Sequence, residues 1–475
     1  MKAPKLPGGS ALLTDMTPLR ASPQFRRLFT GTALSSVGSS FTAFAIPLQV
    51  YDITRSPFAV GAIGLAALVP TLVIGFFGGS VIDAMDRRKL VLITSTCLAA
   101  VSALLAAQAI AGLRVVWILY ALVVIESGLA AVNAPARRTF IPSLLGPDLL
   151  AAGLALNRIS FQVTLIAGPA VAGLITAAAG GHLQACYLID TVSFGAALYG
   201  VAGLPPMPPL ADVARPGLRA VAEGLQFIRR SQVLAGTFLA DLNATVLALP
   251  LALFPAINAE RFGGNPATLG LFLTAIGVGG LVSSAFTGPL RQIRRPGLMM
   301  LVTVSIWGAA FAGFALARSL WLTLALLAIA GAADTFSVVL RGAIVQAVAT
   351  DALRGRLTSA EYVIGAGGDS LGRLESGALG SLTSPVISAL SGGLATVVLS
   401  VVLGLALPKF VAYQAGTGAG AGPAGTEPAG AQPARAEPAR AEPARAEPAR
   451  AEPARAEPAG ERPAHETPAH EAPAS

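Results

Sequence analysis

The sequence is poor in charged residues. Asp, Glu, Lys and Arg make up 12% of the 475 residues, whereas 54% are hydrophobic. A soluble globular domain carries about 25% charged residues, so this long chain has too few to cover a water-facing surface. The apolar residues also come in blocks of roughly 20 or more, the length of helix that crosses a bilayer core of about 30 Å. The composition therefore excludes a soluble globular protein and predicts an all-α integral membrane protein.

Cysteine is also scarce. The two cysteines, Cys97 and Cys186, fall inside apolar blocks and form no CxxC pair. This excludes a disulfide framework and a cysteine metal site, and we expect neither a metal nor a cofactor. The sequence shows no nucleophile–base set and no ATP-binding motif, so an enzyme is not expected. The net charge of +8 then concerns membrane orientation more than nucleic acid.

Twelve apolar blocks predict twelve transmembrane helices in two groups of six. The first six lie near residues 29–51, 58–82, 90–111, 114–134, 155–179 and 183–204. The second six lie near residues 233–257, 267–290, 298–317, 319–340, 358–383 and 386–407. We therefore expect an N-terminal segment at 1–28, a six-helix half at 29–204, a linker at 205–232, a second six-helix half at 233–407 and a tail at 408–475.

Lys and Arg gather in alternate segments between these blocks. One set of segments holds basic clusters such as Arg87–Lys89 and Arg294–Arg295. The segments between them hold only Arg55, Arg114, Arg261 and Arg318. Because cytoplasmic loops carry the excess of Lys and Arg, the pattern predicts that the rich side, with both termini, faces the cytoplasm.

The linker contains an amphipathic segment at 217–230. Its apolar residues fall on one side of a helix, namely Leu218, Val221, Leu225 and Ile228. This pattern favours a helix on the inner membrane surface over a plain linker.

The tail has a different composition from the rest of the chain. It repeats Pro-Ala-Arg-Ala-Glu from Pro433 to Glu457. Proline at every fifth residue forbids a regular helix, and alanine alone offers no core. Residues 408–475 are therefore predicted to be disordered.

The two halves share features at similar spacing. Basic residues follow the second span at Arg87–Lys89 and the eighth span at Arg294–Arg295. Glu126 in the fourth span has a counterpart in Asp334 of the tenth. Because acidic residues inside spans are rare, these matches favour a parallel duplication over chance. Such a duplication is typical of transporters whose halves are related by an axis along the membrane normal.

The loop after the second span resembles the signature loop of the major facilitator superfamily. The residues that carry the resemblance are Gly79-x-x-x-Asp83-x-x-x-Arg87-Arg88, with Ala84 and Asp86 replacing an Arg and a Gly of the signature. In the fifth span, Gly168-Pro169-x-x-x-Gly173 resembles the antiporter motif of exporters in this superfamily. Thr164 and Ala172 stand where that helix-packing motif has glycines.

Further stretches are similar to one branch of the superfamily, the drug:proton antiporters that include the enterobactin exporter and macrolide efflux pumps. The resemblance covers about residues 22–410. The stretches are Phe25-Arg26-Arg27-Leu28, Pro47-Leu48-Gln49-Val50-Tyr51, Asp86-Arg87-Arg88-Lys89-Leu90, Asp351-x-x-Arg354-Gly355-Arg356 and Gly368-Asp369-Ser370-Leu371-Gly372.

The resemblance implies a secondary active transporter that exports a siderophore or a hydrophobic drug by alternating access, in exchange for protons. It further implies a monomer in the bacterial cytoplasmic membrane, whose partners are the substrate, protons and the lipid bilayer. Two alternatives stay open: a nutrient uptake carrier on the same fold, and a non-transporting membrane receptor or scaffold. The antiporter motif favours export over uptake. Acidic residues inside the spans argue against a scaffold, because they are costly there.

Asp83 is a candidate gate latch at the end of the second span; the simpler reading is a solvated loop acid. The stretch Thr358-Ser359-Ala360-Glu361 reads as a capping box that starts the eleventh span. Asp83 could dock on this helix start, where free backbone N–H groups and the helix dipole favour an anion. The other residues expected at the gate are Gly79, Arg87, Arg88, Arg137 and Arg138.

Six charged residues inside the spans are candidates for proton coupling or for the substrate cavity: Glu126, Asp241, Asp334, Asp369, Arg373 and Glu375. Asp369 and Arg373 are four residues apart and could pair on one helix face. Glu375 points to nearly the opposite side, so it needs another partner, water or a proton. This makes Glu375 the first candidate for the coupling site. The alternative is a structural ion network.

Overall fold

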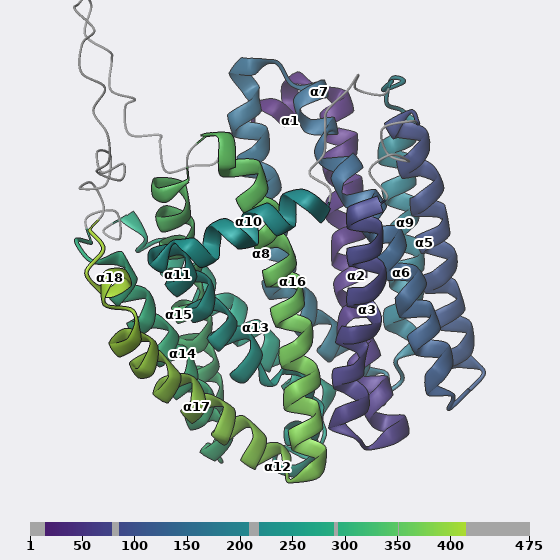
Figure 1. The fold of residues 1–475 in the computed structure, drawn as a ribbon. Helices are drawn as coiled ribbons and strands as arrows, with labels where there is room; N and C mark the ends of the chain where they lie inside the picture. The colour runs from purple at the N-terminus through teal and green to yellow at the C-terminus, as the bar shows by residue number, and fades with distance from the viewer. Residues whose placement is uncertain (1–14, 78–84, 209–217, 289–292, 350, 415–475) are drawn as a thin grey trace, which may run out of the picture. The chain divides into compact units, whose positions relative to one another are not determined.

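The computed structural model describes residues 15–77, 85–208, 218–288, 293–349 and 351–414. Every regular element within these ranges is a helix (Figure 1). Gly79 and Asp83 of the predicted gate lie outside the described residues, as do the Pro-Ala-Arg-Ala-Glu repeats.

The long helices of the N-terminal half coincide with the predicted spans, although two of them begin well before the predicted start, at Pro23 instead of 29 and at Pro147 instead of 155. They are α2 (Pro23–Thr54), α3 (Pro57–Phe77), α5 (Arg87–Ile110), α6 (Val116–Arg138), α8 (Pro147–Ala178) and α9 (Gln184–Ala202), with short helices α1 (Thr17–Ala21) and α7 (Phe140–Leu144). Local sequence explains several of their starts. The Ser22 hydroxyl accepts a hydrogen bond from Phe25 N–H before α2, and the Asp86 carboxylate accepts one from Lys89 N–H before α5. Both are side-chain caps that satisfy free N–H groups of a first turn.

The C-terminal half contains α13 (Pro266–Ser284), α14 (Pro296–Leu316), α15 (Leu320–Val348), α16 (Asp351–Leu382) and α17 (Pro385–Ala406). Within the described residues, 11 helical segments are long and apolar enough to cross a membrane. Helix α16 is not one of them, although it is 32 residues long. Asp369, Arg373 and Glu375 lie near its middle, so the predicted count of twelve depends on this charged helix.

The predicted seventh span, 233–257, is not one continuous helix. It consists of α11 (Gln232–Leu242), a π-helical turn (Asn243–Leu247), a 3-10 turn (Pro250–Leu253) and α12 (Phe254–Arg261). Proline has no N–H, so Pro250 and Pro255 each remove a donor that an α-helix would need. The two prolines favour a break but do not dictate one, because α2, α3, α6 and α8 each contain an interior proline and stay continuous.

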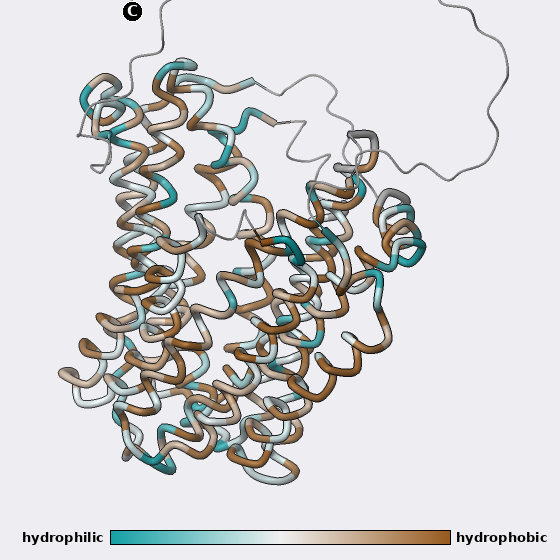
Figure 2. Tube along the Cα trace, turned by 90° about the vertical axis from the view of Figure 1, so that its left-hand side faces the viewer, coloured by the Kyte–Doolittle hydropathy of each residue, from teal (hydrophilic) through white to brown (hydrophobic). Residues whose placement is uncertain are grey.

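Figure 2 shows hydrophobic stretches along the helices and hydrophilic residues gathered toward their ends and connecting loops. Many large apolar side chains on the helices are exposed, among them Trp117, Trp321 and Leu405 at 77%, 81% and 80%. This distribution is expected where lipid, and not water, covers the helices.

Helix α10 (Leu218–Arg230) is the amphipathic helix predicted in the linker. Its apolar residues Val221 and Ile228 are buried, and Gly224 lies against the carbonyl of Arg356 in α16. Arg356 Nε also lies 3.0 Å from a carboxylate oxygen of Glu223. Leu225 of the same apolar side is exposed. The helix therefore packs partly on α16, and its place on the membrane surface stays a prediction.

The predicted start of the disordered tail, at residue 408, is too early. Helix α18 (Pro408–Val411) follows α17, and the Phe410 ring is fully buried. A Cβ atom at Gly236 or Gly297 would clash with this ring, so two glycines make room for it. The chain is part of the packed bundle at least as far as Phe410.

One set of contacts between the two halves lies around Pro57, at a place called here the Pro57 side. There the hydroxyl of Ser381 accepts a hydrogen bond of 2.8 Å from Phe58 N–H. A Cβ atom on Gly61 would clash with the carbonyl oxygen of Arg373, and one on Gly377 would lie 2.5 Å from that of Pro57. Helices α3 and α16 therefore touch backbone to backbone where α3 begins and α16 ends.

Helices α8 and α13 make a second contact between the halves. The Thr274 hydroxyl donates a hydrogen bond of 2.9 Å to the carbonyl of Ile166. Gly270 faces the carbonyl of Pro169, and Gly173 faces that of Pro266. The Gly168-Pro169-x-x-x-Gly173 motif thus lies in a close helix crossing, where small residues let backbones approach.

The buried position of Phe410 leads to a prediction about the tail. Truncation after Gln414 should leave the melting temperature of the detergent-purified protein unchanged. Phe410→Ala should lower it, because emptying a buried Phe site costs roughly 3–5 kcal/mol in packed cores. Phe286→Ala is the matched control, because its ring is 64% exposed. Equal melting temperatures for Phe410→Ala and Phe286→Ala would contradict the assignment.

The glycine contact on the Pro57 side also predicts a cross-link. The hydroxyl oxygens of Ser56 and Ser381 lie 3.4 Å apart, so cysteines at these positions should form a disulfide when both native cysteines are replaced by Ser. Gly61→Val should slow this cross-link roughly fivefold or more, because overpacking costs roughly 1–3 kcal/mol.

Gly367→Val is the control for this experiment, because a Cβ atom there meets nothing within 4 Å. The readout is the rate of disulfide formation in membranes. Equal rates for the Gly61 and Gly367 variants would show that Gly61 does not determine the close approach of α3 and α16.

Candidate functional site

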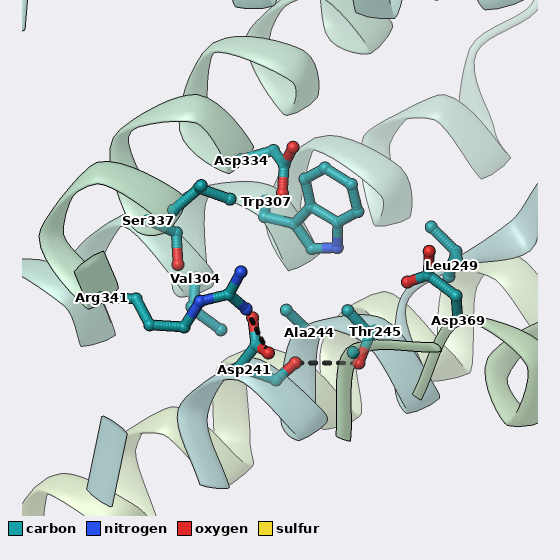
Figure 3. A pocket seen from close by; sticks show the side chains of 12 residues that line it. Asp241, Ala244, Thr245, Leu249, Val304, Trp307, Asp334, Ser337, Arg341 and Asp369 are labelled. Atoms are coloured by element: carbon teal, nitrogen blue, oxygen red, sulfur yellow. Dashed lines mark hydrogen bonds and ion pairs between the residues drawn. The ribbon is translucent and has the colours of Figure 1, made fainter. Parts of the chain in front are cut away.

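A cavity of about 280 Å³ lies in the C-terminal half, beside the break in the seventh span. Its walls come from the end of α11 and the π-helical turn, and from α14, α15 and α16 (Figure 3). The side chains that determine its chemistry are Asp241, Trp307, Asp334, Arg341 and Asp369. No group of three or more His, Cys, Asp or Glu side chains among the described residues is placed to hold a metal ion.

Arg341 is held between two carboxylates from other helices. Its guanidinium forms an ion pair with Asp241 of α11, and its Nε lies 3.4 Å from Glu361 of α16. The tenth span was predicted to end at 340, which would leave Arg341 just outside it. Helix α15 continues to Val348, so Arg341 lies inside the helix, two turns after Asp334 and on the same face. The spacing of two helical turns from Asp334 could have identified Arg341 from the sequence as a residue of the same site.

Asp334 and Asp369 face the cavity without a partner. Both side chains are exposed, although each lies well inside a long helix. In the view of Figure 3 their carboxylates lie on either side of the Trp307 ring. Among the described residues neither forms a hydrogen bond or an ion pair. A carboxylate in such a position requires a wetted cavity or a proton.

The predicted pair between Asp369 and Arg373 is not formed, because no ion pair within 4 Å joins these two described residues. Arg373 belongs to the face of α16 that packs on α3, where its Cδ would lie 3.3 Å from a Cβ atom on Gly64. Asp369 lies one turn earlier and lines the cavity. A spacing of four residues permits a pair on a helix, but here packing between helices turns the two side chains to different neighbours.

Glu375 and Glu126 lie away from this cavity. Both are half-buried, and neither has a hydrogen bond or an ion pair to another described residue. Asp334 lines the cavity whereas its predicted counterpart Glu126 does not. The proposed equivalence of the two acids therefore does not extend to their surroundings.

An acid that the sequence analysis passed over lies in the N-terminal half. Asp190 of α9 is 1% exposed, and its carboxylate accepts hydrogen bonds from three hydroxyls at 3.2, 2.7 and 2.7 Å, those of Ser39, Thr42 and Ser102. These donors come from α2 and α5. The signal was an Asp inside the sixth predicted span, and its bonding links three helices of this half.

The predicted capping box at Thr358 is wrong. Helix α16 already begins at Asp351 and runs through Thr358 without interruption. The Ser359 hydroxyl donates to the carbonyl of Gly355 within the helix, and Glu361 lies near Arg341. No proline separates Asp351 from Thr358, and Gly355 lies within the helix, so the helix starts earlier and leaves no free N–H groups at residue 358 for a docking acid.

The predicted gate arginines contact the N-terminal half itself. The Arg88 guanidinium donates to the carbonyl of Ala202, and that of Arg137 donates to the Ser95 hydroxyl at 3.1 Å. Arg87 is buried and Arg138 is exposed. The described contacts of Arg88 and Arg137 therefore join helices α5, α6 and the end of α9, and their roles in a gate stay predictions.

A larger hollow of about 820 Å³ lies between α3 and α6. Its lining is almost entirely apolar, with side chains such as Leu65, Val69 and Trp117. It lacks the few placed polar groups that orient a ligand, so the charged cavity beside the break is the stronger candidate site.

Comparison with known proteins agrees with this architecture. Residues 13–416 match the family described as transmembrane secretion effector. The chain is 24% identical over 396 residues to the enterobactin exporter EntS of Shigella boydii serotype 18 and to that of Escherichia coli O139:H28, covering 83% of this chain and 94% of each relative.

Solved structures share the fold. The nucleoside transporter NupG has a TM-score of 0.65 at 15% identity, over 82% of this chain and 100% of that one. A bacterial homologue of the iron transporter ferroportin, in an inward-facing state, has a TM-score of 0.60 at 17% identity, over 80% and 98%. With a family match over most of its length, the chain belongs to the transmembrane secretion effector family of the major facilitator superfamily.

Proposed function

We propose that this protein is a proton-coupled exporter of a small organic molecule, of the siderophore or hydrophobic-drug class. The family and the relatives named as enterobactin exporters support export, because the similarity extends over nearly the whole length of those relatives. The cavity volume of about 280 Å³ is near the lower limit of ligand pockets, roughly 300–1,000 Å³. A small substrate, or one part of a larger one, would fit.

The proposed setting is the bacterial cytoplasmic membrane, with the protein working as a monomer of twelve spans. Helix α16, the eleventh span along the chain, would bring the count to twelve, and its charges would face the cavity or neighbouring helices. Both termini would lie in the cytoplasm, as the distribution of Lys and Arg indicates. The contacts between the halves on the Pro57 side then correspond to closure toward the outside, as one state of alternating access requires.

The observation that carries the proposal is the pair of unpartnered carboxylates in the cavity, Asp334 and Asp369. An ionised acid inside a span costs several kcal/mol unless it is paired or wetted. A carboxylate that faces a cavity can release its proton when substrate binds and regain it when substrate leaves. Antiport requires such an exchange. Arg341 is less available, because Asp241 and Glu361 already surround it.

Transport by purified protein in liposomes tests this assignment. A hydrophobic fluorescent dye and enterobactin serve as probes, with and without an imposed pH gradient. Asp334→Asn and Asp369→Asn should each lose most of the acceleration by the gradient, because an amide cannot exchange a proton. Glu375→Gln is the comparison, since Glu375 is a half-buried acid outside the cavity.

The outcomes separate the candidate sites. If both Asp variants keep the acceleration and Glu375→Gln loses it, coupling belongs to Glu375. Acceleration in all three variants would contradict coupling through the acids of α15 and α16. Transport of the probes only in the direction of uptake would contradict export.

A further inference from the structure

We propose that Trp307 is a positioning residue: it holds the broken backbone of the seventh span and thereby sets the shape and the affinity of the cavity. The proposal deepens the proposed transport function, on which it rests, because it concerns the same cavity. It assigns a role to a side chain that carries no charge and is 6% exposed.

The break leaves two residues outside any helix. Ala248 and Leu249 lie between the π-helical turn and the 3-10 turn, and Ala248 has φ −123° and ψ 44°. Inside a membrane-spanning bundle, backbone carbonyls at such a break have no bulk water to bond to. A bare carbonyl there costs several kcal/mol, so another group must reach it.

Trp307 of α14 supplies one of these groups. Its indole Nε1–H donates a hydrogen bond of 2.9 Å to the carbonyl of Ala248. The indole also packs edge-on against Phe311 one turn later, with ring centroids 4.9 Å apart and an interplanar angle of 75°. Packing against Phe311 therefore holds the indole in the orientation that the hydrogen bond needs. The indole nitrogen can donate a hydrogen bond but cannot accept one.

Side chains from two further helices hold the same segment. The Ser376 hydroxyl of α16 lies 3.3 Å from the carbonyl of Leu249 and shares its hydrogen with the carbonyl of Arg373 in its own helix, also at 3.3 Å. The Thr396 hydroxyl of α17 donates to the carbonyl of Asn243 at 3.3 Å. The Asn243 amide in turn donates to the Thr396 carbonyl and to the Ser400 hydroxyl, both at 3.0 Å. The break is thus bonded from α14, α16 and α17, which indicates a fixed bend and not a free hinge.

The position of the bend determines which side chains of the seventh span line the cavity. Asp241 lies just before the π-helical turn, Thr245 lies within it, and Leu249 follows it; all three line the cavity. Of the side chains that bond the break from other helices, only Trp307 also lines the cavity. A site held in its bound geometry avoids the cost of ordering when the ligand arrives, so loss of this bond should weaken binding more than it weakens the fold.

The experiment compares full-length variants in detergent. Trp307→Phe removes the N–H donor and keeps an aromatic ring, whereas Trp321→Phe is the matched control, because Trp321 is 81% exposed. Ser376→Ala removes a second bond to the break with little change in volume, and Ser376→Thr restores a hydroxyl. Amide hydrogen exchange over 243–253 is measured together with the dissociation constant of a hydrophobic fluorescent dye.

Trp307→Phe and Ser376→Ala should each speed exchange over 243–253 by about fivefold or more, because a lost bond makes local opening easier. Exchange in α2, α5 and α9 should stay unchanged. Trp307→Phe should also weaken dye binding, whereas Trp321→Phe should leave exchange and binding at the wild-type values. Ser376→Thr should return the exchange rate toward wild type.

Two results would overturn the inference. Unchanged exchange over 243–253 in Trp307→Phe would show that the indole does not hold the break. Faster exchange with unchanged dye affinity would show that the break does not set the cavity. If the wild-type protein binds the dye but does not transport it in liposomes, the transport proposal fails while these two comparisons still decide the role of Trp307.

Discussion

A backbone carbonyl inside a membrane-spanning bundle must find a donor within the protein, and much of the C-terminal half follows from this constraint. Pro250 and Pro255 remove two N–H donors from the seventh span, and this span is broken between α11 and α12. Side chains from α14, α16 and α17 reach the freed region and bond its carbonyls. These helices, with α15, surround the one place where the seventh span bends, and the charged cavity lies beside it.

The acidic residues inside the spans have different surroundings in the two halves. In the N-terminal half, Asp190 is surrounded by hydroxyl donors from neighbouring helices and is nearly inaccessible. In the C-terminal half, Asp334 and Asp369 are exposed to a cavity and have no bonded partner among the described residues. A saturated carboxylate stabilises helix packing, whereas one open to a cavity can bind a proton or a ligand. Asp190 and the acids of the cavity therefore serve different purposes in the two halves.

Close approach of helices gives the structure its contact between halves. Glycines at 61, 377, 173 and 270 lie against carbonyl groups of the opposite half. In lipid, helices gain little from burying apolar surface, so tight van der Waals packing of small residues is a main source of association. A contact of this kind can open and close without breaking strong bonds, as rocking of one half against the other requires.

The sequence by itself determined the membrane class, the approximate positions of the helical spans and the family. These depend on hydropathy, on the placement of Lys and Arg and on local motifs, which act over short stretches of chain. It also predicted Asp241, Asp334 and Asp369 as candidates, because an acid inside a span is costly wherever it lies. Only the tertiary structure decided which of these acids meet. It brought Arg341 to Asp241, turned Asp369 away from Arg373, left Glu375 outside the cavity and buried Phe410 beyond the predicted end of the bundle. The physical reason is that the partner of a buried charge or of a free carbonyl comes from another helix, and periodicity along one helix cannot say which helix packs against it.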